Sequence, residues 1–181
     1  MHRDRDLIFV GRLVSDKGVD LLIEAIHLLR ERRISPNLTI VGTGAEQEKL
    51  QSLVSNLELT NQIEFVGLRT GQELRLFLNR HRTIVVSSRW KEPFGLVALE
   101  GIACGCQAIV ASNGGLPDAI TPLAIPFDRQ NVAALADAIE RTLTEQFDWE
   151  RYWRLSDEVM LSYRARHIAS QYLEVLNQAC I

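Results

Sequence analysis

The sequence of 181 residues is poor in cysteine and contains no long apolar run. Three cysteines form an odd and sparse set, which argues against a disulfide scaffold and favours a reducing compartment. No apolar run reaches the ~18 residues that span a bilayer, and the first residues carry no secretory signal. Basic residues are not in excess either, because 20 lysines and arginines face 23 acidic residues, and this argues against a nucleic-acid-binding module. We therefore expect a cytoplasmic protein, with peripheral association of the whole protein with a membrane left open.

Short β-branched segments that alternate with longer helical patterns make up most of the chain. Strands are expected over 7–10, 38–41, 63–66, 83–86, 108–110 and 124–126, and helices over about 19–29, 45–57, 95–104 and 132–143. Nearly continuous apolar strands linked by helices predict an α/β fold, a Rossmann-like parallel sheet with helices on both faces. We expect a single domain over residues 1–181, with a helical tail from about residue 148.

Polar or glycine-containing loops follow four of the expected strands, at 11–18, 42–44, 87–95 and 112–115. In parallel sheets, ligands bind beyond the carboxyl ends of the strands, where helix N-termini attract anions. Arg12 and Lys17 lie in the first loop, and two cations there repel each other unless an anion lies between them. Exposed charges on a solvated loop are the alternative. Gly42 and Gly44 fall short of the dinucleotide fingerprint because Gln47 stands at its third glycine position, and tight turns also explain them.

The segment from Glu92 to Glu100 places one carboxylate before an expected helix and a second one inside it. Glu100 stands in an otherwise apolar stretch, where an unpaired carboxylate is costly. The backbone N–H groups of Phe94, Gly95 and Leu96 are expected to be the free donors of that helix start. Vicinal hydroxyls suit a carboxylate and a phosphate suits N–H groups, so the segment fits a sugar nucleotide. A solvated helix face is the alternative.

Taken together and in order, these segments resemble the C-terminal, donor-binding half of a GT-B glycosyltransferase of group 1 (family 4). The resemblance runs from Phe9 to about Leu143. It rests on VGRL with KG at 10–18, IVGTG at 40–44, FVG at 65–67, EPFGL to Glu100 at 92–100, and ASNGGLP at 111–117. The resemblance implies one half of a GT-B fold.

The resemblance also implies a role for each matching residue. Arg12 and Lys17 would hold the diphosphate of the nucleotide sugar and neutralise it as it leaves. Glu92 would bind hydroxyls of the transferred sugar, and Glu100 would bind the ribose. The remaining positions expected to contact the nucleotide sugar are Gly11, Gly42, Gly44, Leu68, Phe94, Gly95 and Leu96.

Family members usually retain the anomeric configuration without a bound metal, so the resemblance implies a retaining hexosyltransferase with no metal and no cofactor. Catalysis would rest on positioning and on stabilising the leaving diphosphate. Glu92 as a covalent nucleophile is the less favoured alternative.

The implied partners are a nucleotide sugar, such as a UDP- or GDP-sugar, and an N-terminal acceptor-binding domain that is absent from this chain. The chain alone should then bind the nucleotide sugar but transfer little. A nucleotide-binding or regulatory module without transferase activity is the alternative. A dinucleotide-dependent oxidoreductase is disfavoured, because Gln47 stands where the dinucleotide fingerprint has its third glycine.

Three further residue patterns indicate ordinary structural roles. Cys104 and Cys106 have no further ligand pair nearby, so we expect buried small residues there and no zinc site. His81 lies between two arginines just before a strand, which indicates a solvated loop. Asp16 is placed to cap the first helix.

Overall fold

The computed structural model describes residues 3–91, 95–112 and 114–179. The strands are β1 (Arg5–Val10), β2 (Leu38–Val41), β3 (Ile63–Gly67), β4 (His81–Val86), β5 (Gln107–Ala111) and β6 (Ala124–Phe127). The helices are α1 (Val19–Glu31), α2 (Gln47–Asn56), α3 (Gly71–Arg80), α4 (Leu96–Ala103), α5 (Leu116–Ala119), α6 (Val132–Thr144), α7 (Trp149–Ser162) and α8 (Ala165–Ala179), and a short 3-10 turn, η1 (Ser15–Lys17), precedes α1.

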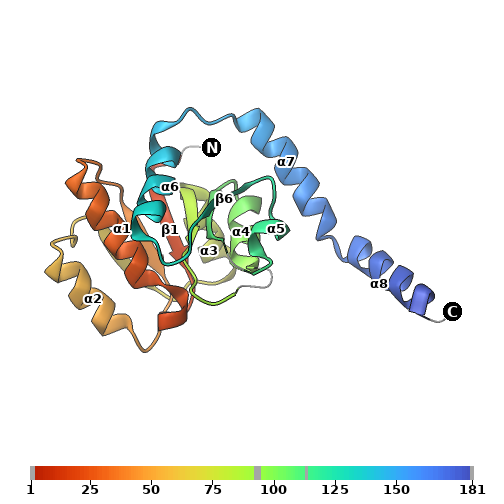
Figure 1. Ribbon diagram of the computed structural model, residues 1–181, viewed down its shortest axis with the longest axis horizontal. Helices are drawn as coiled ribbons and strands as arrows, with labels where there is room; N and C mark the ends of the chain where they lie inside the picture. Colours follow the sequence, from red (N-terminus) through yellow and green to blue (C-terminus); the bar gives the residue numbers. More distant parts are fainter. Residues whose placement is uncertain (1–2, 92–94, 113, 180–181) are drawn as a thin grey trace. The chain divides into compact units, whose positions relative to one another are not determined.

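The strands form one parallel sheet in the order β3-β2-β1-β4-β5-β6. Figure 1 shows α1, α2 and α6 on one face of the sheet and α3, α4 and α5 on the other. The Rossmann-like α/β fold predicted from the sequence is therefore confirmed. Because all the strands are parallel, the loops after β1, β2, β3, β4, β5 and β6 meet along one edge.

The apolar strands explain why both faces of the sheet are covered, since their alternate side chains point to opposite faces. Leu7, Phe9 and Ile40 join the core under α1, α2 and α6. The opposite face receives Ile84, whose side chain leaves room on α4 only for Gly101. Side chains on both faces of the sheet are therefore buried under helices, and this packing holds the strand ends from which the loops emerge.

The chain divides into two compact units, residues 1–147 and residues 148–181. The first unit contains the sheet. The second consists of α7 and α8, where the rings of Trp149, Tyr152 and Trp153 contact one another at centroid distances of 5.4–6.5 Å. One nucleotide-sugar-binding domain over the whole chain stays a prediction. None of the helices that the structure describes is both long and apolar enough to cross a membrane.

Two local expectations, about Asp16 and His81, were wrong, and one short helix was not anticipated. Asp16 does not cap α1, because η1 occupies that position and Gly18, with a left-handed φ of 63°, is the residue before the helix. The short helix α5 was not expected from the sequence; it begins with Leu116 and Pro117, where proline is compatible with a first helical turn. His81 is buried, because α3 runs directly into β4 and no loop separates them.

Candidate functional site

The centre of the sheet, between β1 and β4, is the point where the order of the strands reverses. After β1 the chain forms α1 on one face of the sheet, and after β4 it forms α4 on the other face. β1 and β4 are parallel neighbours, and Arg5 pairs with His81 at their first residues. Open α/β sheets bind ligands at such a point, beyond the carboxyl ends of the strands. The β1–α1 loop, with Arg12 and Lys17, therefore stands where the fold favours a ligand.

On one side, backbone hydrogen bonds join the β1–α1 loop to the β2–α2 loop. The N–H of Gly11 donates to Val41 O at 3.0 Å, and the N–H of Leu13 donates to Thr43 O at 2.9 Å. The N–H of Glu46 in turn donates to Leu13 O at 3.0 Å. The two loops therefore form one continuous ladder beyond the ends of their strands.

Two glycines allow these loops to approach so closely. A Cβ at Gly42 would lie 1.9 Å from Gly11 O, and a Cβ at Gly44 would lie 2.2 Å from Leu13 O. Gly42 also has a φ of 137°, which side-chain-bearing residues rarely adopt. Both glycines thus have a packing role in the loops. Contacts of Gly11, Gly42 and Gly44 with a nucleotide sugar stay a prediction.

On its other side, the β1–α1 loop is joined to the β4–α4 loop. The Ser87 hydroxyl donates to Lys17 O at 3.0 Å, and the N–H of Arg89 donates to Asp16 O at 2.8 Å. Gly18 lies against the same loop, because a Cβ there would be 2.2 Å from Ser87 O. The loop that carries the two cations is therefore held between its neighbours on both sides.

The two predicted cations differ in their surroundings. Arg12 is exposed, and its side chain makes no hydrogen bond or ion pair with any residue in the described part of the chain. Lys17 is partly buried at the end of η1. A cation that no protein carboxylate neutralises is well suited to receive an anionic ligand.

Helix α4 carries the second carboxylate of the predicted pair. Gly95, with a left-handed φ of 56°, precedes the helix, and Leu96 and Glu100 follow one turn apart on its exposed side. The apolar stretch of sequence around Glu100 does not surround its carboxylate, because α4 turns Ala98, Leu99 and Ile102 to the core instead. Glu100 is solvated and available to a ligand.

Glu92 and Phe94 lie outside the described residues, so the geometry of the carboxylate pair stays a prediction. Leu68 follows β3 and is 64% exposed. Its carbonyl accepts a hydrogen bond from Arg69 at 2.9 Å, and the Arg69 guanidinium lies 6.0 Å from the centre of the Phe77 ring. The apolar side chain of Leu68 therefore stands open at the same edge of the sheet.

Arg89 is a residue at this edge that the sequence reasoning did not single out. Its guanidinium forms two hydrogen bonds with the carboxylate of Asp20, in the first turn of α1. Burial raises the pKa of the Asp20 carboxyl. The hydrogen bonds and the positive charge of Arg89 lower it by more than burial raises it, so the pKa lies below its usual value. No sequence spacing indicates this pair, because the partners are far apart in the chain.

A second polar cluster lies at the opposite edge of the sheet, where β4 begins. His81 Nε2 lies 2.9 Å from the Thr39 hydroxyl, and that hydroxyl donates to Glu64 at 2.8 Å. Burial lowers the pKa of His81. Nearby, the buried Arg3 side chain donates to the His81 carbonyl, and burial raises the pKa of Cys106 to about 12. This cluster joins strands and is remote from the predicted site.

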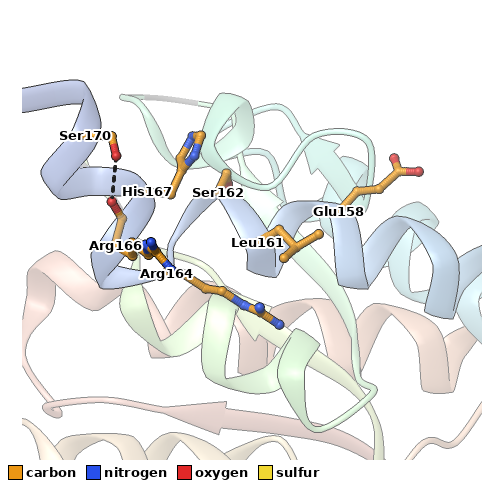
Figure 2. Close-up of a pocket in the computed structure, with 7 residues that line it drawn as sticks. All are labelled: Glu158, Leu161, Ser162, Arg164, Arg166, His167 and Ser170. Carbon is orange, nitrogen blue, oxygen red and sulfur yellow. Dashed lines mark hydrogen bonds between the residues drawn. The ribbon is translucent and has the colours of Figure 1, made fainter. Parts of the chain in front are cut away.

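Within residues 3–91, 95–112 and 114–179, no group of three or more histidine, cysteine, aspartate or glutamate side chains is arranged to hold a metal ion. The second unit contains a pocket at the bend between α7 and α8, lined by Glu158, Leu161, Ser162, Arg164, Arg166, His167 and Ser170 (Figure 2). In it, the Ser170 hydroxyl donates to Arg166 O at 3.0 Å. None of the residues predicted to bind a nucleotide sugar is among those that line it.

A family model described as "Glycosyl transferases group 1" matches residues 2–160. The chain belongs to this family. Among curated relatives, the glycogen synthase of Mycobacterium tuberculosis is 31% identical, with a match that covers 87% of this chain and 42% of that protein. The chain spans between 30 and 42% of the length of the first curated relatives that it matches.

Solved glycosyltransferase-related structures share the fold of this chain. Sucrose-phosphate synthase from Thermosynechococcus elongatus superposes with a TM-score of 0.81 at 29% identity, over 97% of this chain and 45% of that one. Anabaena Alr3699/HepE, solved in complex with UDP and glucose, superposes with a TM-score of 0.81 at 21% identity, over 96% and 48% of the two chains. The second likeness concerns the fold alone.

Proposed function

We propose that this group 1 glycosyltransferase chain is the donor-binding half of a retaining family 4 enzyme that transfers a hexosyl unit from a nucleotide diphosphate sugar. The observation that carries the proposal is the position of Arg12. Its guanidinium, which has no ion-pair partner among the described residues, lies on the loop after the central strand β1, where the strand order reverses and where the fold favours ligands. The acceptor would be held by a second, N-terminal domain.

Each predicted residue would then act on a part of the nucleotide sugar that its chemistry suits. Arg12 and Lys17 would hold the diphosphate, since a guanidinium forks to phosphate oxygens and an ammonium acts as a point charge. The solvated Glu100 carboxylate would accept hydrogen bonds from the two ribose hydroxyls. Glu92 would do the same for hydroxyls of the transferred sugar.

Catalysis, in this proposal, is mainly electrostatic. As the bond between the sugar and the diphosphate breaks, negative charge grows on the phosphate oxygen, and cations fixed beside that oxygen stabilise the transition state more than the ground state. The loop ladders on both sides of the β1–α1 loop hold in place the backbone that carries the two cations, so little reorganisation of the loop is needed. The proposal requires neither a metal ion nor a cofactor.

Nucleotide binding is the first property to test, and UDP and GDP are the probes. Isothermal titration of the chain with each nucleotide should detect binding to at least one. Arg12→Ala and Glu100→Ala should each weaken it by about tenfold to a hundredfold, because a hydrogen bond to a charged group contributes about 1.5–3 kcal/mol.

The chain offers a matched pair of control variants. Arg141 and Glu145 form an exposed ion pair at 3.1 Å, at the end of α6. Arg141→Ala and Glu145→Ala remove the same charges and should leave nucleotide affinity unchanged. Absence of binding by the unmodified chain to either nucleotide, or an equal effect of all four substitutions, would overturn the proposed function.

A further inference from the structure

The ion pair between Arg89 and Asp20 has the geometry of a strong contact. Arg89 Nη1 donates to Asp20 Oδ1 at 2.6 Å and Nη2 donates to Oδ2 at 2.9 Å, so both carboxylate oxygens are engaged. The two side chains are only 30% and 26% exposed. A bidentate, partly buried pair of this kind fixes orientation as well as distance. It ties the β4–α4 loop to the first turn of α1.

Arg89 is bonded to more than Asp20. Its Nη1 also donates to Ser15 O at 3.0 Å, so both hydrogens of that nitrogen are used within the protein. Its backbone N–H donates to Asp16 O, and its carbonyl accepts from Arg129 Nη1 at 3.0 Å. Through one residue, the β4–α4 loop is therefore joined to η1, to α1 and to the segment after β6.

The bonds on η1 have a direct consequence for Lys17. Three consecutive carbonyls, those of Ser15, Asp16 and Lys17, all accept hydrogen bonds from Ser87 or Arg89. The backbone of η1 is thus oriented by the β4–α4 loop rather than by α1 alone. Any shift of that loop would move Lys17 with it.

We propose that Arg89 is a positioning residue, which holds η1 and residues 87–89 of the β4–α4 loop in one fixed relation and so keeps Lys17 in place for the ligand. This inference rests on the proposed function, since it concerns the same site. Asp20 has the complementary role of holding the Arg89 guanidinium. Arg89 acts on the ligand through its neighbours, because Asp20 and Ser15 engage its Nη1.

The experiment compares Arg89→Gln with a matched variant at the other end of α1. Arg32 is also partly exposed, at 34%, and its Nη1 donates to Asp137 at 2.6 Å and to Glu140 at 2.9 Å. Arg32→Gln therefore removes a comparable ion pair of α1 away from the site. UDP affinity is measured by titration and the free energy of unfolding by urea denaturation, for both variants and for the unmodified chain.

If Arg89 positions the site, Arg89→Gln weakens UDP binding about tenfold, because a displaced Lys17 loses a hydrogen bond to a charged group that contributes about 1.5 kcal/mol, while Arg32→Gln leaves the affinity unchanged. Both lower the free energy of unfolding to a similar extent. Asp20→Asn weakens binding as well, and the double variant Asp20→Asn with Arg89→Gln binds no worse than Arg89→Gln alone. Arg89→Lys keeps the charge but not the fork, and recovers only part of the loss.

Two results would overturn the inference. One is equal UDP affinity of Arg89→Gln and Arg32→Gln. The other is full additivity of the Asp20 and Arg89 effects, which would make Arg89 a direct ligand contact.

Amide hydrogen exchange separates this inference from the proposed function, because it needs no ligand. The N–H groups of Lys17 and Gly18 are bonded within η1 to Val14 O and Ser15 O. If Arg89 fixes η1, both exchange faster in Arg89→Gln than in Arg32→Gln; equal exchange rates contradict the inference. If the unmodified chain binds neither UDP nor GDP, the proposed function fails while this comparison still decides whether the positioning contact exists.

Discussion

Replacing Gly42 with alanine should separate the β1–α1 and β2–α2 loops. Two costs add at this position. The φ of 137° costs an alanine about 1–3 kcal/mol. The new Cβ, only 1.9 Å from Gly11 O, forces a backbone shift that costs about 1–3 kcal/mol. We expect the free energy of unfolding to fall by about 4 kcal/mol in total, a large share of the roughly 5–15 kcal/mol that stabilises a typical domain.

Two further glycines allow the costs to be measured one at a time. Gly44→Ala tests the close contact alone, because its new Cβ would lie 2.2 Å from Leu13 O while the φ of Gly44 is not positive. Gly71→Ala introduces the strained backbone, with a φ of 54°, where a Cβ meets nothing within 4 Å. We expect about 1–3 kcal/mol for the first and about 1–2 kcal/mol for the second.

Urea denaturation of the three variants at constant pH is the measurement. The losses should rank with Gly42→Ala largest, and its loss should approach the sum of the other two. If Gly42→Ala costs no more than Gly71→Ala, the loops part without penalty, and the argument that their close contact fixes the β1–α1 loop is refuted.

Two other predictions concern stability. Burial lowers the pKa of His81 below its ordinary value of 6.5, so as the pH falls the unfolded chain binds a proton at a higher pH than the folded chain. The free energy of unfolding should therefore fall as the pH is lowered from about 7 to about 5. In urea titrations, His81→Gln should make that pH dependence weaker. An unchanged slope in His81→Gln would assign the dependence to other groups. Asn131 caps α6 by accepting from Ala134 N–H at 3.0 Å, so Asn131→Ala should lower the free energy of unfolding by about 1 kcal/mol and Asn131→Asp should largely preserve it. Equal melting temperatures for the alanine and aspartate variants would show that the cap contributes nothing.

The architecture could be predicted from the sequence because each strand is a short apolar segment that needs burial on both faces. β2 has the predicted bounds, and the others differ by one or two residues at their ends. The order of the loops along one edge then follows from the parallel arrangement alone. This is why the positions of Arg12 and Lys17 along that edge could be anticipated before any contact was known.

What could not be predicted depends on contacts between distant residues. The pairing of Asp20 with Arg89 spans 69 residues and leaves no mark on the local pattern of either segment. His81, between two arginines, has the sequence neighbourhood of a surface residue, yet it is buried because α3 ends where β4 starts. The exposure of Glu100 was open to prediction, since the helical period already places Ala98, Leu99 and Ile102 on the other side.

The strand order also constrains when the site can form as the chain folds. β1 can pair with β2 once residue 41 is available, but its other edge stays open until β4 pairs Arg5 with His81 and Ile8 with Ile84. Until then, β1 presents unpaired backbone groups, the kind of edge that invites wrong pairing. Closing so distant a contact is slow relative to local helix formation. The loop with Arg12 and Lys17 is therefore synthesised well before β4, but it is fixed in place only after β4 has paired with β1.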